Sequence, residues 1–344
     1  GVCRAAGMSK TCVRWGVLGN AMIARDFMIP ELRGSELCRV TAVASRAPLP
    51  AEAAPECRHY SSYEALLEDA EIDAVYVPVP NALHAQWAIR AMQHGKHVLC
   101  EKPMGCTVSD GDAMCRAAEE NGVLLMEAFM YRCGEKFRRM MQIVNSGVLG
   151  RICSMQGTHG YPLTWKSPAR EDAELGGGCL YDVGCYVVDC MNAVMTAQGE
   201  RLLQVGGSLG CRGGVDWNAA CWLRYDGGTL GTLHSWFNAQ QEQRMVLVGE
   251  RGTLCVPMLF EPGEGELLLT IGDRTERISV PGSACYRLEA EAMSRAILYG
   301  EPLPIGLSDT MRNLDALERL YAAAERWQFS GRGARIGWGT GVGL

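Results

Sequence analysis

Short runs of β-branched and aliphatic residues alternate with longer amphipathic stretches from Val13 to about Met126. This alternation is the βαβ pattern of a parallel sheet whose crossover connections are helices. Strands are expected at 13–18, 39–45, 74–78, 96–101 and 123–128, with helices between them at 24–32, 62–69, 83–94 and 109–121. The first part of the chain therefore predicts a Rossmann-type α/β domain.

The pattern changes after Gly150, where strand-like segments follow one another across Gly-rich turns. These segments lie at 152–159, 219–225, 229–238, 244–249 and 267–271, and helices are expected at 178–196, 286–298 and 308–327. Consecutive strands joined by short turns favour a large antiparallel sheet. A chain of 344 residues is long enough for two domains. We expect an α/β Rossmann domain over 11–130, followed over 131–344 by an α+β domain with a large, mostly antiparallel sheet.

The composition excludes several classes of protein. The net charge is −6 and no cluster of Lys and Arg is long enough to bind a polyanion, so we expect no nucleic-acid partner. No stretch approaches about 18 uninterrupted apolar residues, so we expect no membrane span. The 16 cysteines show no C-x-x-C or zinc-ligand spacing, and the first ten residues are too short and polar for a secretion signal. We expect reduced thiols, no metal and a cytoplasmic protein.

A turn rich in small residues stands where the first strand passes into the first helix. Gly19 allows a tight turn, Ala21 keeps the backbone open to a pyrophosphate, and Ala24 lets the helix pack closely on the strand. The helix N-terminus then offers free N–H groups and a positive dipole end to the phosphates. We infer a dinucleotide site, and a plain strand-turn-helix corner is the alternative. The expected contacts are Gly19, Asn20, Ala21, Met22 and Ile23.

The end of the second strand indicates which dinucleotide binds. NAD-preferring sites usually place a carboxylate there for the ribose 2′-hydroxyl, whereas this chain has Ser45 and Arg46. Arg46 can pair with a 2′-phosphate, which a carboxylate would repel. We therefore predict NADP as the cofactor, with NAD as the second choice. Alternatively, Arg46 only extends into solvent from the strand end.

Two further stretches carry a family resemblance. The first contains Pro78, Asn81, His84, Glu101, Lys102 and Pro103. The second contains Gly176, Gly177, Gly178, Asp182 and Tyr186. Over about residues 13–325 the chain closely resembles the glucose-fructose oxidoreductase/inositol dehydrogenase (Gfo/Idh/MocA) family. Many relatives carry His where this chain has Tyr186. In this respect the chain is similar to the branch that contains dimeric dihydrodiol dehydrogenase and NADP-linked xylose dehydrogenase.

The resemblance implies a two-domain fold, a nicotinamide cofactor and a Lys-Pro peptide that is often cis. It also implies pairing of subunits through the second sheet, so we expect a homodimer or a tetramer. Cofactor contacts are expected from the first stretch, where His84 alternatively caps local backbone. These contacts are Pro78, Asn81, His84, Glu101 and Lys102.

Three residues are candidates for the chemistry. Lys102 follows the carboxyl end of a strand, the edge at which open α/β sheets bind ligands. Asp182 and Tyr186 lie four residues apart in an expected helix and so project from one face. A phenol whose pKa is lowered by a neighbouring lysine can serve as base for carbinol oxidation and as acid for carbonyl reduction. Alternatively, Asp182 only complements the helix dipole and Tyr186 is a core aromatic.

The sequence therefore predicts an NADP-dependent oxidoreductase that transfers a hydride between the nicotinamide and a sugar, cyclic polyol or dihydrodiol. Arg132, Trp165 and Lys166 are expected to contact this small-molecule substrate. Two alternatives stay open: a relative that cleaves glycosides through transient NAD oxidation, and a nucleotide-binding sensor without catalysis. Retention of Lys102, Asp182 and Tyr186 together argues against the sensor.

Overall fold

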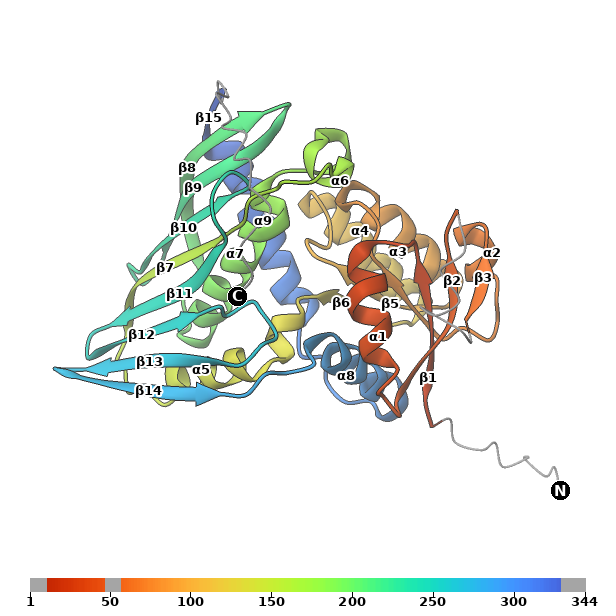
Figure 1. The fold of residues 1–344 in the computed structure, drawn as a ribbon, viewed down its shortest axis with the longest axis horizontal. Coiled ribbons are helices and arrows are strands. Elements are labelled where there is room, and N and C mark those ends of the chain that lie inside the picture. The colour runs from red at the N-terminus through yellow and green to blue at the C-terminus, as the bar shows by residue number, and fades with distance from the viewer. Residues whose placement is uncertain (1–10, 47–56, 329–344) are drawn as a thin grey trace, which may run out of the picture.

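The computed structural model describes residues 11–46 and 57–328, which form two sheets with helices packed on them (Figure 1). The first sheet has six parallel strands in the order β3-β2-β1-β4-β5-β6. Its strands are β1 (Val13–Leu18), β2 (Cys38–Ala44), β3 (Arg58–Tyr60), β4 (Ala74–Val77), β5 (His97–Glu101) and β6 (Leu125–Ala128). Only β3 was not predicted, because three residues are too few to show a pattern. The strand order reverses between β1 and β4, where such sheets bind ligands beyond their carboxyl ends.

The helices of this half begin close to their predicted positions. A π-helical turn η1 (Ala24–Met28) runs into α1 (Ile29–Leu32), and α2 (Tyr63–Leu67), α3 (His84–Gln93) and α4 (Val108–Asn121) follow. Ser62 caps α2 by accepting a hydrogen bond from the backbone N–H of Ala65, as its hydroxyl predicted. Thr107 and Asp110 form a reciprocal capping box at the start of α4.

The second sheet has nine strands in the order β14-β13-β12-β11-β7-β10-β9-β8-β15. They are β7 (Ile152–Gly160), β8 (Leu202–Arg212), β9 (Val215–Tyr225), β10 (Leu230–Trp236), β11 (Glu242–Gly249), β12 (Gly252–Pro257), β13 (Gly265–Ile271), β14 (Arg274–Val280) and β15 (Glu325–Gln328). Only the β7–β10 and β8–β15 pairs are parallel. The expected fold class, a Rossmann sheet followed by a large, mostly antiparallel sheet, is confirmed. Strands β8, β12, β14 and β15 were not predicted.

The predicted C-terminal end of the last helix is wrong. Helix α9 (Leu307–Ala323) stops four residues before the predicted limit, and Ala324 is extended at φ −75° and ψ 138°. The following residues, Glu325–Gln328, pair with β8 as a parallel edge strand. Their sequence contains no helix breaker, so pairing with a distant strand decided the conformation.

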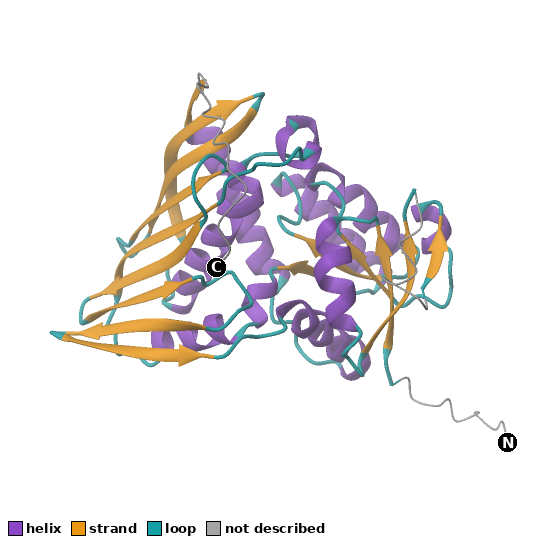
Figure 2. Ribbon diagram, in the orientation of Figure 1, coloured by secondary structure: helices purple, strands orange, loops and turns teal. Residues whose placement is uncertain are grey.

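The helices of the second half cover one face of its sheet. Helices α5 (Glu135–Asn145), α7 (Cys185–Ala197) and α9 lie on the face toward the first sheet, and no described helix covers the opposite face (Figure 2). Helix α8 (Cys285–Tyr299) follows this sheet in the chain but packs against β1, β2 and β5 of the first sheet. The domain boundary near residue 130 stays a prediction, since one cluster of buried apolar side chains joins Trp15 and Tyr76 to Met191.

None of the helices in 11–46 and 57–328 is long and apolar enough to cross a membrane. Within the same ranges, no group of three or more His, Cys, Asp and Glu side chains is placed to hold a metal ion.

Candidate active site

A cavity of about 1280 Å³ lies between the two halves of the molecule. The first half contributes the β1 turn, the ends of β2 and β4, and Lys102. The second half contributes residues of β7, of the segment after it, and of η5 (Leu180–Gly184) and α7. Ligand sites are typically about 300–1,000 Å³, so this cavity has room for a dinucleotide and a second molecule.

The turn after β1 forms one end of the cavity. Gly19 has φ +110°, and a Cβ at this position would come 3.0 Å from the Tyr63 hydroxyl. The backbone here therefore stays open to the cavity, as a bound pyrophosphate requires. Ser45 and Arg46 line the cavity at the end of β2. Every predicted cofactor contact lies in the cavity wall except His84: Gly19, Asn20, Ala21, Met22, Ile23, Ser45, Arg46, Pro78, Asn81, Glu101 and Lys102.

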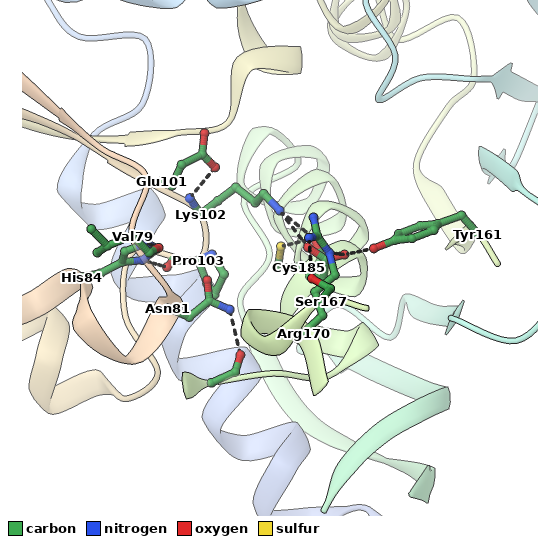
Figure 3. Close-up of polar contacts among 12 residues, drawn as sticks. Val79, Asn81, His84, Glu101, Lys102, Pro103, Tyr161, Ser167, Arg170 and Cys185 are labelled. Carbon is green, nitrogen blue, oxygen red and sulfur yellow. Dashed lines mark hydrogen bonds and ion pairs between the residues drawn. The ribbon is translucent and has the colours of Figure 1, made fainter. Parts of the chain in front are cut away.

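His84 is buried behind the cavity wall. Its ring nitrogens lie 2.8 Å from the carbonyl oxygens of Val79 and Pro103 (Figure 3). The side chain thus joins the segment after β4 to the segment after β5. Of the two predicted roles of His84, this contact corresponds to the alternative one, the capping of local backbone. Burial lowers the pKa of His84 to about 4. We assign His84 to the support of the cavity wall and not to cofactor contact.

The segment after β5 carries Glu101 and Lys102 to the cavity. Glu101 accepts hydrogen bonds from the Tyr76 hydroxyl at 2.5 Å and from the backbone N–H of Lys102 at 3.1 Å. The Lys102–Pro103 peptide is cis, as the resemblance implied. Asn81 donates a hydrogen bond to the carbonyl of Gly176 at 2.8 Å, which ties the first half to the triple glycine (Figure 3).

Lys102 and Asp182 meet across the two halves. The Lys102 Nζ donates to the Asp182 backbone carbonyl at 2.7 Å and lies 3.7 Å from the Asp182 carboxylate. The same carboxylate accepts from the Tyr161 hydroxyl at 2.6 Å and from Arg170 Nε at 3.0 Å. Burial acts to raise the pKa of Asp182, but Arg170 and Lys102 outweigh it and lower the pKa to about 2. Asp182 is therefore a fixed anion at neutral pH that orients Lys102.

Tyr186 lies at the start of α7, directly after the π turn η5 that contains Asp182. Its ring centroid is 4.9 Å from Lys102 Nζ, and Phe129, His159 and Phe260 pack around the ring. Tyr186 lines the cavity, and its hydroxyl has no hydrogen-bond partner among residues 11–46 and 57–328. The phenol is thus available to a bound molecule.

The electrostatic surroundings of Tyr186 differ from the prediction. Burial, together with Tyr286 and Glu101, raises the pKa of Tyr186 well above its ordinary value. The expectation that Lys102 lowers this pKa is wrong for the protein without ligands, because loss of water outweighs the lysine charge. Tyr186 is therefore a protonated phenol at neutral pH, the form that donates a proton.

The three predicted substrate contacts lie in different places. Arg132 lies outside the cavity wall, where it pairs with Asp189 at 2.9 Å and Asp309 at 3.6 Å, so the structure does not bring it to the cavity as predicted. An arginine held by two carboxylates supports the packing of α7 against α9. Trp165 lines the cavity, whereas Lys166 is exposed and outside its wall.

Several residues of the cavity were not predicted. Tyr161 and Arg170 come from the segment after β7, Phe260 from the segment after β12, and Tyr286 from α8. His159, in β7, stacks on Phe260 beside Tyr186. Burial and Lys102 lower the pKa of His159 to about 3, so its ring is neutral. Only the position of His159 and Tyr161 at a strand end could have indicated their role from the sequence.

Comparisons with known proteins agree with this architecture. Residues 13–129 match the model of an oxidoreductase family with an NAD-binding Rossmann fold, and residues 137–255 match the Gfo/Idh/MocA C-terminal domain. D-xylose 1-dehydrogenase (NADP(+)) 2 of Haloferax volcanii is 32% identical over 319 residues, covering 90% of this chain and 97% of that protein. Trans-1,2-dihydrobenzene-1,2-diol dehydrogenase of Xenopus laevis is 26% identical, covering 83% of this chain and 90% of that protein.

A solved structure is similar over nearly the whole chain. The 3-ketoreductase KijD10 from Actinomadura kijaniata, in complex with NADP and TDP-benzene, superposes with a TM-score of 0.84. It is 27% identical, covering 92% of this chain and 99% of that chain. Further structures of KijD10 carry a lysine-to-alanine or a tyrosine-to-phenylalanine substitution, each with NADP and TDP-benzene.

Proposed function

The chain belongs to the Gfo/Idh/MocA oxidoreductase family, and we propose that Tyr186 and Lys102 are the catalytic pair of its NADP-dependent reaction. The reaction is hydride transfer at a CH–OH or carbonyl carbon of a sugar, cyclic polyol or dihydrodiol. The observation that carries the assignment is the meeting of Lys102 from the first half with Tyr186 from the second, in one cavity with the dinucleotide turn. Such convergence positions a proton-transfer group beside a cofactor.

The residues of the cavity fit NADP. The open backbone at Gly19 and the start of η1 would hold the pyrophosphate, and Ser45 and Arg46 would hold the 2′-phosphate. When bound, NADP supplies the hydride acceptor or donor. Lys102, directly after the carboxyl end of β5, would then lie at the substrate side with Tyr186.

The proton chemistry belongs to Tyr186. In reduction, its protonated phenol donates to the substrate oxygen; in oxidation, the phenolate form takes the hydroxyl proton. The raised pKa of Tyr186 in the free protein favours the donating form. Lys102 stabilises negative charge that develops on the substrate oxygen or on the phenolate, and Asp182 holds the lysine in place. Asp182 itself is a positioning residue, since its carboxylate is already occupied by Tyr161 and Arg170.

The reaction is tested by a substrate screen. Aldoses, inositols and cyclic diols are incubated with NADP and the formation of reduced cofactor is followed by absorbance. We expect at least one of these compounds to be oxidised. Glycoside cleavage with no net release of NADPH would instead support the glycosidase alternative, and NADP binding without any turnover would support the sensor. Neither alternative is supported by the relatives, which are named as dehydrogenases and reductases.

Arg46 provides a test of cofactor preference. It lines the cavity and forms no ion pair with another residue of the described ranges. We expect NADP to bind more tightly than NAD, and Arg46→Asp to erase or reverse the preference. A charge-assisted hydrogen bond contributes about 1.5–3 kcal/mol, or roughly ten- to a hundredfold in affinity. Fluorescence titration with both cofactors measures this effect, with Arg116→Asp on the outside of α4 as a control of equal charge change. NAD preference in the unmodified protein would contradict the assignment.

We also propose that the chain forms a homodimer, or a tetramer built from dimers, through the second sheet. Trp222 and Leu230, which are 36% and 49% exposed, alternate along β9 and β10 with buried residues and so lie on the face of this sheet that no described helix covers. An antiparallel sheet can leave one face in water, but large exposed apolar side chains on that face favour contact with another protein surface. Light scattering at micromolar concentration should give at least twice the monomer mass, and Trp222→Glu should lower it. A monomer mass for the unmodified protein would refute this proposal.

A further inference from the structure

An aromatic pair stands in the cavity wall away from the dinucleotide turn. Trp165 lies in the segment after β7 and is 46% exposed although it lines the cavity. Its ring stacks on that of Tyr161, with centroids 5.7 Å apart and planes inclined by 11°. It has no other ring contact within the described ranges. An exposed aromatic ring in a cavity wall is available for a ligand to cover, since ligand pockets are lined mostly by apolar and aromatic side chains.

The aromatic pair is tied to the catalytic residues. The Tyr161 hydroxyl donates to the Asp182 carboxylate at 2.6 Å, and Asp182 in turn holds Lys102 (Figure 3). Tyr161 is therefore fixed at both ends, by Asp182 at its hydroxyl and by Trp165 on its ring face. A ring supported in this way presents Trp165 in one orientation, which lowers the entropic cost of ligand binding.

The charges near the aromatic pair indicate a neutral ligand. Of the described lining residues outside the dinucleotide end, the cations are Lys102 and Arg170, and the carboxylates are Glu101, Asp182 and Glu261. Both cations are engaged by Asp182. Lys166 is exposed but lies outside the cavity wall. A second pyrophosphate would need free cations, preferably a bidentate arginine, and would face the carboxylates instead.

We propose that Trp165 is a stacking subsite for a flat apolar ring carried by a neutral substrate, a ring-bearing glycoside or fused-ring diol, and not for a nucleotide-linked sugar. This inference rests on the proposed oxidoreductase function and specifies which substrates that function prefers. The reacting CH–OH group lies at Tyr186, and the ring of the same molecule lies against Trp165. Aromatic stacking contributes specificity because a free sugar lacks the ring and loses the contact.

The test compares one sugar in three forms. NADP-saturated enzyme is titrated calorimetrically with methyl β-D-xylopyranoside, phenyl β-D-xylopyranoside and UDP-xylose. We expect the phenyl glycoside to bind about two- to tenfold more tightly than the methyl glycoside, the range that aromatic stacking provides, and more tightly than UDP-xylose. Trp165→Ala should abolish the difference between phenyl and methyl forms, while Trp165→Phe should keep most of it.

A matched control is Trp327→Ala. Trp327 is 47% exposed, nearly the same as Trp165, but lies on β15 outside the cavity wall, so the preference for the phenyl form should remain. Circular dichroism and NADP affinity check that each variant folds. The subsite is overturned by equal affinity for phenyl and methyl forms, by a preference that survives Trp165→Ala, by tightest binding of UDP-xylose, or by failure of both glycosides to bind.

The outcome is distinguishable from failure of the proposed function. If sugars or diols reduce NADP but the ring preference is absent, the stacking subsite is wrong and the oxidoreductase function stands. If the ring preference depends on Trp165 but none of the sugars, inositols and diols of the screen reduces NADP, the subsite stands and the function is wrong.

Discussion

Tyr186→Phe is expected to lower kcat by about a hundredfold or more, the usual contribution of a positioned acid or base. The substitution removes only the hydroxyl, which has no hydrogen-bond partner among the described residues. The aromatic packing against Phe129, His159 and Phe260 is retained, so the fold and the NADP affinity should change little. Steady-state kinetics on the best substrate of the screen, together with NADP titration, measure both quantities.

The competing assignment places the acid at Tyr286, a second phenol in the cavity wall. Tyr286→Phe is the matched variant, since it removes the same atom from the same cavity, and it should cost much less than Tyr186→Phe. Because burial raises the pKa of Tyr186, the rate of carbonyl reduction should not fall between pH 7 and 9 through loss of the donated proton. Near-normal turnover of Tyr186→Phe would end this mechanism and move the proton-transfer role to another group.

Lys102→Met is expected to lower kcat at least as much as Tyr186→Phe. The substitution keeps most of the side-chain volume but removes the charge that lies 4.9 Å from the Tyr186 ring centroid. Arg170 and Tyr161 still hold Asp182 in the variant, so the substrate side should remain ordered. What is lost is the stabilisation of negative charge as the proton moves, an effect that is large in a site from which water is excluded.

The control for this variant is Lys166→Met, which removes an exposed lysine outside the cavity wall and should leave kcat unchanged. The double variant Lys102→Met, Tyr186→Phe should be little slower than either single variant, because residues that act as a unit are not additive. Fully multiplicative losses in the double variant would show that the two residues act in separate steps.

Local patterns were sufficient for the first half of the molecule. The strands β1, β2, β4, β5 and β6 each bury a short apolar run, and α2 and α4 begin at the side-chain caps Ser62 and Thr107. Local patterns also predicted most of the cofactor contacts. Gly19, Ser45 and Lys102 come at strand ends, and the carboxyl ends of parallel strands lie at one edge of the sheet. His84 is the exception, since burial and two carbonyl partners hold it behind the wall.

Pairing with distant segments decided what the patterns did not show. The local sequence of Glu325–Gln328 predicted the end of a helix, yet this segment forms the edge strand β15. It does so because β8 offers unpaired backbone groups with which it can form hydrogen bonds. Arg132 was expected at the substrate but is held by Asp189 and Asp309. A guanidinium is placed by the carboxylates it meets in the folded chain, and the spacing of residues along the sequence does not determine these partners.

The sequence by itself determined the fold class, the dinucleotide turn, and the identity of Lys102, Asp182 and Tyr186 as candidates, because the alternation of strands and helices, the turns and the motifs are all carried by residues close together in the chain. Only the tertiary structure decided how these three groups act. It brought Arg170 and Tyr161 onto Asp182, which makes the carboxylate a fixed anion, and it placed Tyr186 where partial burial and the neighbouring Tyr286 and Glu101 raise its pKa. Electrostatic effects of this kind depend on burial and on distances between segments remote in the chain, so they arise only when both halves pack together.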